Sequence, residues 1–212
     1  LRRGNINLVA ARQNQGKTQF GMYCMMDLVH KYKLPVLHLD MGEMSRFELQ
    51  MRATSLLSKG LISPDLLETG EWRKNPETEK IVTKALKLME NYEYYYNDVS
   101  DLSVDELFSL LRRFKLAHCS IIGGENQFLC HYDYIKPFES TGYSKEYEVL
   151  GHFMKKLKNF FKNEMKAPLH TSLQINKSGI TSNKNSSTVD ESDNAYSLSD
   201  RIGQQVSWAA TL

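Results

Sequence analysis

The sequence predicts an α/β protein in which a mostly parallel central sheet is covered by helices on both faces. Short apolar segments of strand length alternate along the chain with longer segments whose apolar residues recur at helical spacing. The 212 residues are 41% hydrophobic and 25% charged, which is ordinary for a globular domain with its own core. We therefore expect residues 1–212 to form one domain.

The composition excludes several classes of protein. A formal net charge of +2 is too small to indicate a nucleic-acid or membrane partner by itself. No apolar run approaches the ~18 residues of a membrane helix, and the first residues lack the apolar stretch of a signal peptide. The three cysteines, Cys24, Cys119 and Cys130, have no C-x-x-C spacing, so we expect reduced thiols in a cytoplasmic protein rather than disulfides or a zinc site.

The first elements alternate between strand and helix. Residues 6–11, INLVAA, form an apolar run that predicts a strand, and apolar spacing over 18–32 predicts a helix. Residues 34–40 predict a second strand, which opens with a proline. The helix expected over 44–60 ends at a glycine.

The middle of the chain predicts an outer layer of helices followed by a return to the sheet. Residues 61–91 are rich in lysine and glutamate, and a Ser-Pro and an Asn-Pro turn each introduce a helix there. Aromatic residues over 92–99 predict a strand. The helix expected over 103–118 begins with Ser103 and Glu106 at capping-box spacing.

The last part contains two more strands before a long polar segment. Residues 127–135 and 167–175 predict strands, and the amphipathic stretch 147–166 between them predicts a helix. Residues 176–200 are so poor in large apolar groups that we expect a long mobile loop. The final VSWAATL predicts another strand, and the absence of an initial Met suggests a piece of a longer polypeptide.

The stretch AARQNQGKTQF, directly after the first strand, has the features of a phosphate-binding loop. In such loops backbone N–H groups surround the phosphates, the lysine reaches the β- and γ-phosphates, and the Ser or Thr hydroxyl ligates Mg²⁺. Gly16, Lys17 and Thr18 supply these groups, and Ala11 replaces the usual first glycine at the strand exit, where a negative φ tolerates its methyl group. The expected nucleotide-binding residues are Ala11, Arg12, Gln13, Asn14, Gln15, Gly16, Lys17, Thr18 and Gln19.

A nucleoside triphosphatase also needs a carboxylate near Mg²⁺ and a base for the attacking water, and both should lie at the carboxyl ends of strands. Asp133 ends a predicted strand and is our candidate for the metal side, together with Thr18. Glu43 follows the second strand and is the candidate base, with Asp40 as the alternative. Gln174, at the end of a later strand, can donate its amide to a γ-phosphate.

Five segments together resemble the RecA-type motor domain of DnaB-type replicative helicases, particularly phage members. They are ARQNQGKTQF, VLHLDMGEMSRFELQMRATS, YYYNDVSDLSVDELFSLLRRFKLAH, YDYIKPFE and APLHTSLQINKSG, and their order and spacing agree with the family over nearly the whole chain. The resemblance implies a RecA-like P-loop NTPase fold that uses ATP and Mg²⁺, with Glu43 as catalytic glutamate, Asp133 on the Mg²⁺ side and Gln174 as γ-phosphate sensor.

The same resemblance implies partners. The family forms a six-membered ring that translocates along single-stranded DNA and hydrolyses ATP between its subunits. The expected protein partners are a primase or a helicase loader. If the chain is phage-encoded, the expected location is the cytoplasm of the bacterial host. The DNA-facing loops would follow Asp133 and Gln174, so Lys136, Lys177 and Lys184 are candidate phosphate contacts. The family's N-terminal domain, arginine finger and last basic motif are expected to lie outside the chain.

Two other functions remain open from the sequence. One is a phage recombination or packaging ATPase, because the same fold serves several motors. The other is a nucleotide- or DNA-binding module without catalysis, which the departure at Ala11 keeps open.

Overall fold

A computed structural model describes residues 1–122, 125–136, 146–174 and 205–211 of the chain. The strands in these residues are β1 (Ile6–Ala11), β2 (Val36–Asp40), β3 (Tyr94–Asp98), β4 (Ser120–Ile122), β5 (Glu125–Gln127), β6 (Leu129–Asp133), β7 (Leu169–Gln174) and β8 (Trp208–Thr211). The helices are α1 (Lys17–Tyr32), α2 (Arg46–Leu57), α3 (Pro64–Glu68), α4 (Pro76–Glu90), α5 (Val104–His118) and α6 (Glu146–Phe160), with a 3-10 turn η1 (Glu71–Lys74) and a π-helical turn η2 (Phe161–Met165).

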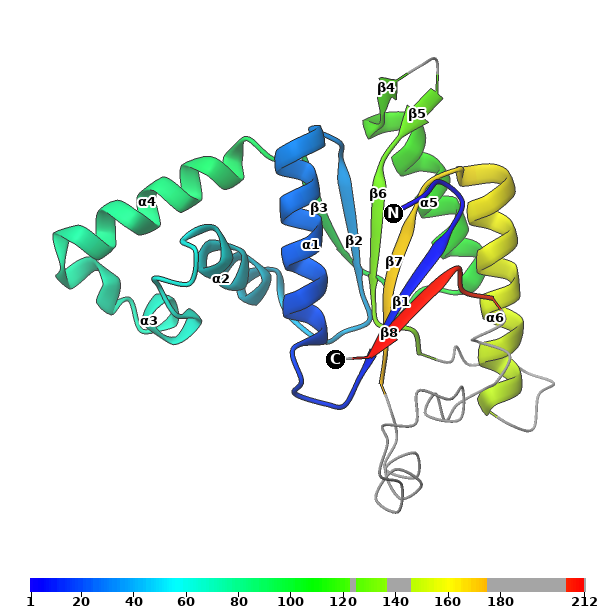
Figure 1. Cartoon of the computed structure of the whole chain (residues 1–212), viewed down its shortest axis with the longest axis horizontal. Helices are drawn as coiled ribbons and strands as arrows, with labels where there is room; N and C mark the ends of the chain where they lie inside the picture. Colours follow the sequence, from blue (N-terminus) through cyan, green and yellow to red (C-terminus); the bar gives the residue numbers. More distant parts are fainter. Residues whose placement is uncertain (123–124, 137–145, 175–204, 212) are drawn as a thin grey trace.

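Six of the described strands form one sheet in the order β3-β2-β6-β7-β1-β8, and every pairing in it is parallel. Parallel neighbours need crossover connections, which the helices supply. Figure 1 shows α1 on one face of the sheet and α5 and α6 on the other. The predicted α/β architecture with helices on both faces is therefore confirmed.

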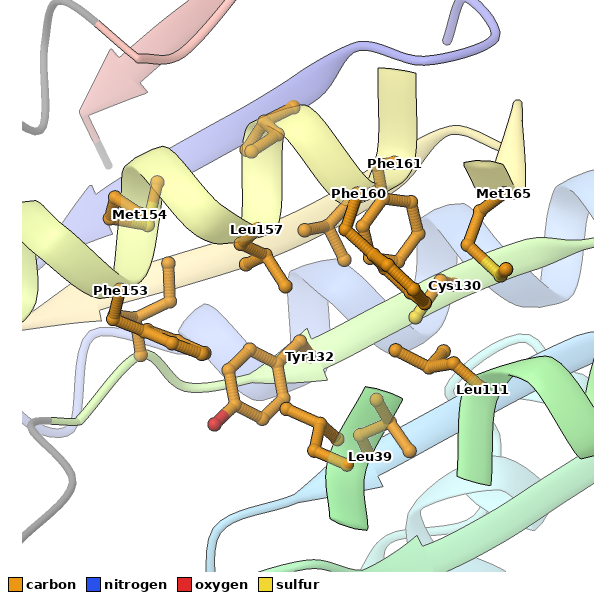
Figure 2. Packing of buried hydrophobic residues seen from close by; sticks show 14 of the residues in the cluster. Leu39, Leu111, Cys130, Tyr132, Phe153, Met154, Leu157, Phe160, Phe161 and Met165 are labelled. Carbon is orange, nitrogen blue, oxygen red and sulfur yellow. The ribbon is translucent and has the colours of Figure 1, made fainter. Parts of the chain in front are cut away.

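The larger core lies between the sheet and helices α5 and α6. Helix α6 places Leu150, Phe153, Met154 and Leu157 at helical spacing, and all four are buried. Their side chains meet the strand residues, with Tyr132 of β6 facing Phe153 (Figure 2). Burial of each such side chain stabilises the fold by about 1.5–3 kcal/mol.

The smaller core lies under α1. Met22, Met25, Met26 and Val29 of that helix pack against the sheet and against α2, whose Ala53 is fully buried. Helices α2, α3 and α4 extend beyond α1, away from the sheet (Figure 1), which agrees with the predicted outer helical layer. Among the described residues, no helix combines the length and apolar character that crossing a lipid bilayer requires.

Two local expectations are corrected. The helix predicted over 147–166 is α-helical only to Phe160 and ends in the π-turn η2, because the N–H of Lys166, at φ 52°, bonds the carbonyl of Phe161. The strand predicted over 127–135 is shorter, and the antiparallel pair β4–β5 precedes it. The sequence does contain a turn signal for this pair, the Gly-Gly dipeptide at 123–124.

Gly21 of α1 lies over the buried ring of His131, so we expect Gly21→Ala to destabilise the fold. An added Cβ would stand 2.4 Å from His131 Cε1, and the ring is flanked by His38 and His170 with centroids 4.6 and 5.0 Å away. The clash should outweigh the better helix propensity of alanine and lower the free energy of unfolding by about 1–3 kcal/mol, as measured by urea denaturation. The double variant Gly21→Ala/His131→Ala should recover part of the lost free energy of unfolding. If Gly21→Ala alone is as stable as the parent, this packing of α1 on His131 is contradicted.

Candidate functional site

The predicted site residues that the structure describes gather at one edge of the sheet. Because all six strands are parallel, their carboxyl ends meet there, and the register places Asp40 beside Asp133 and Ala11 beside Gln174. This edge is the usual ligand-binding crevice of open α/β sheets. Four of the predicted residues, far apart in the sequence, are thereby brought to one place.

The phosphate-binding loop joins β1 to α1 as the sequence predicts. Gly16 has φ 80° and precedes the first helical residue, Lys17, without a side-chain cap, so the first N–H groups of α1 remain available to an anion. Asn14 also has a positive φ, 62°. Ala11 is the buried last residue of β1 and is not among the residues with positive φ, so its methyl group fits as expected.

Lys17 stands at the mouth of this loop with its ammonium group exposed. Its Nζ donates a weak hydrogen bond to the carbonyl of Arg12 at 3.4 Å and lies 5.7 Å from the ring centroid of Tyr134. Neither contact neutralises the charge of Lys17. The side chain is therefore free of a carboxylate partner in the described residues and can turn to a phosphate.

Thr18 and Asp133 are in direct contact, which is the central geometric feature of the site. Thr18 Oγ1 donates to Asp133 Oδ2, and Ser172 Oγ of β7 donates to Asp133 Oδ1 at 2.5 Å. Asp133 is fully buried, so the two hydroxyl groups fix the orientation of its carboxylate. Sequence reasoning missed Ser172, because only the strand order places β7 next to β6.

Asp40 and Glu43 have different surroundings. Asp40 is buried and its Oδ2 accepts the backbone N–H groups of Glu43 at 2.8 Å and Met44 at 3.3 Å. Burial raises the pKa of Asp40, although these two hydrogen bonds oppose the shift. Glu43 follows on the loop with its side chain 40% exposed. Asp40 therefore shapes the loop that presents Glu43 to solvent.

Lys136, expected from the sequence to face DNA, lies against the loop after β2. Its Nζ donates to a carboxylate oxygen of Glu43 and to the carbonyl of Met41 at 3.0 Å, and it lies 4.9 Å from the centroid of the Tyr134 ring. Partial burial lowers the pKa of Lys136, but the hydrogen bond and charge of Glu43 outweigh that effect and the net pKa is raised. Lys136 is charged and is held beside the candidate base.

The other predicted DNA contacts, Lys177 and Lys184, lie outside the described residues, as does the long loop expected over 176–200. Gln174 is the last described residue of β7 and is partly exposed at the same edge as the phosphate-binding loop. Its place is compatible with the expected contact to a γ-phosphate.

A row of histidines crosses the sheet just below this edge. His38 of β2, His131 of β6 and His170 of β7 are register partners on adjacent strands, and all are buried under α1. Burial is the largest cause of a low pKa in each of the three imidazoles, which are therefore neutral at pH 7. The sequence alone could not assemble this row, because only the strand order β2-β6-β7 brings the three histidines together.

Comparisons with known proteins agree with this geometry. A family model described as the DnaB-like helicase C-terminal domain matches residues 1–194. The chain is 26% identical over 161 residues to a probable replicative DNA helicase of Trieres chinensis, covering 75% of this chain and 33% of that protein. It is also 26% identical over 177 residues to the replicative DNA helicase DnaB of a Synechocystis species, covering 84% of this chain and 19% of that protein.

Two solved structures share the fold. One is described as an ATPase domain and superposes with a TM-score of 0.81 at 17% identity, covering 100% of this chain and 70% of that one. A DnaB-like replicative helicase, described with its interactions with primase, gives 0.80 at 17% identity, covering 99% of this chain and 47% of that one. The RecA-like fold expected from the resemblance is thus confirmed. The chain spans a third or less of the two curated relatives described above.

Proposed function

Since the chain belongs to the family of DnaB-like helicase C-terminal domains, we propose that it is the ATP-hydrolysing motor of a replicative DNA helicase. The observation that carries the proposal is the contact between Thr18 and Asp133, which joins the phosphate-binding loop to a buried carboxylate on β6. This pairing is what a P-loop NTPase needs to hold a metal-bound triphosphate.

The residues present fit a magnesium nucleotide. The N–H groups that begin α1 and the ammonium group of Lys17 would bind the phosphates, and Thr18 and Asp133 would hold Mg²⁺. Bound Mg²⁺ neutralises charge on the phosphate oxygens. The nucleotide contacts proposed for the loop extend over Ala11, Arg12, Gln13, Asn14, Gln15, Gly16, Lys17, Thr18 and Gln19.

Glu43 is the proposed base that orients and deprotonates the attacking water. Its exposed carboxylate can reach solvent, whereas the Asp40 carboxylate is buried and already accepts two backbone N–H groups. Gln174 is proposed to sense the γ-phosphate from the end of β7, next to Ala11.

The proposed polymer substrate is single-stranded DNA. Lys136, together with Lys177 and Lys184 of the segment that follows Gln174 in the sequence, would contact its phosphates without reading sequence. Because Lys136 now binds Glu43, a DNA phosphate that attracts Lys136 would release the carboxylate for catalysis. Such competition would couple DNA binding to turnover.

Assembly and partners follow from the family. We propose a homo-oligomeric ring, hexameric as the resemblance implies, with the nucleotide between subunits. One structural relative is described with its interactions with primase, so a primase or a loader is a proposed partner of this chain. A recombination or packaging ATPase is the alternative enzymatic function, because the fold alone does not distinguish these motors from a helicase.

The proposal predicts Mg²⁺-dependent ATP hydrolysis that single-stranded DNA stimulates severalfold. We would measure ATP binding by calorimetry and steady-state hydrolysis over a range of protein concentrations, with and without oligothymidylate. Asp133→Asn, which keeps the shape of the side chain but removes its charge, should abolish hydrolysis. ATP binding without turnover, even in a longer chain that includes the arginine finger, would favour the nucleotide-binding module without catalysis. A chain that binds no ATP would contradict both the motor and that nucleotide-binding module.

A further inference from the structure

The sheet face beneath α1 carries polar groups where a buried face normally carries apolar ones. Adjacent strands place their register partners within contact distance of one another on the same face. His38, His131 and His170 occupy one such row, and Asp40 and Asp133 occupy the next. Residues two positions apart on a strand share a face, so Asp133 and His131 point to the same side.

Three of these side chains form a compact set of ligand atoms. One ring nitrogen of His38, one of His131 and one carboxylate oxygen of Asp133 all lie within 4.8 Å of one another. All three residues have no exposed surface. Among the described residues, the Nε2 atoms of His38 and His131 have no hydrogen-bond partner. Buried polar nitrogens are rarely left unpaired, so these two atoms require an explanation.

The other atoms of the same side chains are held by neighbours. His38 Nδ1 lies 2.9 Å from the hydroxyl of Tyr94, and His131 Nδ1 lies 3.0 Å from Nδ1 of His170. The Asp133 carboxylate accepts from Ser172 and Thr18. Metal-binding histidines typically have one ring nitrogen on the ion and the other on an orienting partner. His38 and His131 already have this arrangement, because in each of them Nδ1 contacts a neighbouring side chain and Nε2 is unpaired among the described residues.

We propose that His38, His131 and Asp133 form a binding site for a transition-metal dication of the Zn²⁺ class. Two imidazoles and one carboxylate are a common ligand set for Zn²⁺, with a fourth position left for water. With an ion bound, the Nδ1–H of His38 would donate to Tyr94 and that of His131 would donate to His170, which leaves each Nε2 with a lone pair for the ion. His170 and Tyr94 are the positioning residues.

The site shares Asp133 with the Mg²⁺ position of the proposed function. Imidazole nitrogen suits Zn²⁺, whereas Mg²⁺ prefers oxygen ligands, so the two ions would use the same carboxylate from different sides. A Zn²⁺ ion held by the histidines would draw Asp133 away from Thr18. The effect of this displacement of Asp133 on ATP hydrolysis rests on the proposed function, but the existence of the metal site does not.

The test is a titration of the nucleotide-free chain with Co²⁺, followed by competition with Zn²⁺. We expect one equivalent of Co²⁺ to give a visible absorption band that Zn²⁺ abolishes and that millimolar Mg²⁺ leaves unchanged. His38→Gln and His131→Gln should each weaken binding at least tenfold. His30→Gln is the matched control, since His30 lies elsewhere, on α1, and bonds Tyr92.

Folding must be separated from binding in these variants. Circular dichroism would identify a variant that fails to fold, and Tyr94→Phe would then serve as a milder change, because it removes only the hydroxyl that orients His38. The proposal is overturned if the parent binds no Co²⁺ or Zn²⁺, or if folded His38 and His131 variants bind as tightly as His30→Gln. ATP binding measured on the same samples tests the proposed function separately.

Discussion

Lys17→Ala is expected to abolish ATP hydrolysis and to weaken Mg²⁺-ATP binding by up to about a hundredfold. Within the described part of the chain, the Lys17 ammonium group makes a weak bond to the Arg12 carbonyl and lies near the Tyr134 ring, so it is available to the phosphates and does little for stability. Loss of a charge-assisted contact to a phosphate costs about 3 kcal/mol or less, and a two-unit change in log affinity corresponds to about 2.7 kcal/mol. Calorimetric titration with ATP, combined with a hydrolysis assay, measures both effects.

Lys31→Ala is the matched control for that substitution. Lys31 lies on the same helix, α1, and makes an exposed i,i+4 ion pair with Asp27. Such pairs contribute about 0.3–0.5 kcal/mol to helix stability, so both variants should unfold at nearly the parent's urea concentration. Equal ATP affinities in the two variants would show that the phosphate-binding loop is not the nucleotide site.

Glu43→Gln is expected to lower the rate of ATP hydrolysis by about 10²–10⁴-fold while leaving ATP binding intact. The substitution keeps the size of the side chain and removes the charge that would accept a proton from water. It also removes the ion pair with Lys136, which is partly exposed and therefore adds little stability. Single-turnover hydrolysis and equilibrium ATP binding, measured on the same preparation, separate catalysis from affinity.

Asp40→Asn distinguishes the two candidate bases. Asparagine retains an acceptor oxygen for the N–H groups of Glu43 and Met44, so the loop can keep its shape. We expect this variant to retain substantial turnover. If Asp40→Asn is inert and Glu43→Gln turns over normally, the base is Asp40 and the assignment of Glu43 is wrong.

Much of the fold could be predicted because its signals are local. The Gly16-Lys17-Thr18 triplet after an apolar strand specifies a loop and a helix start within a few residues, and the structure has both. The capping box of Ser103 and Glu106 likewise marks the start of α5. The place of Asp133 at the carboxyl edge of the sheet was predictable because it ends a strand, and the strand ends of a parallel sheet share one edge.

What could not be predicted depends on strand order. Lys136 and Glu43 are 93 positions apart, and their contact exists only because β6 lies next to β2. The histidine row needs both the order β2-β6-β7 and its register, since a shift of one residue would turn His131 to the opposite face. The π-turn after α6 depends on one left-handed residue, Lys166, which has no distinctive sequence signal.

The position of β1 in the sheet has a consequence for biosynthesis. β1 pairs with β7 and β8 and with none of the strands that follow it directly, and Asn7 bonds the Leu169 carbonyl 162 positions along the chain. At typical ribosomal rates the first strand then waits on the order of ten seconds for its partner to be made. Long-range parallel pairing also slows folding itself. Before translation has passed β7, the apolar residues of β1 therefore lack the neighbouring strand that covers them in the folded chain.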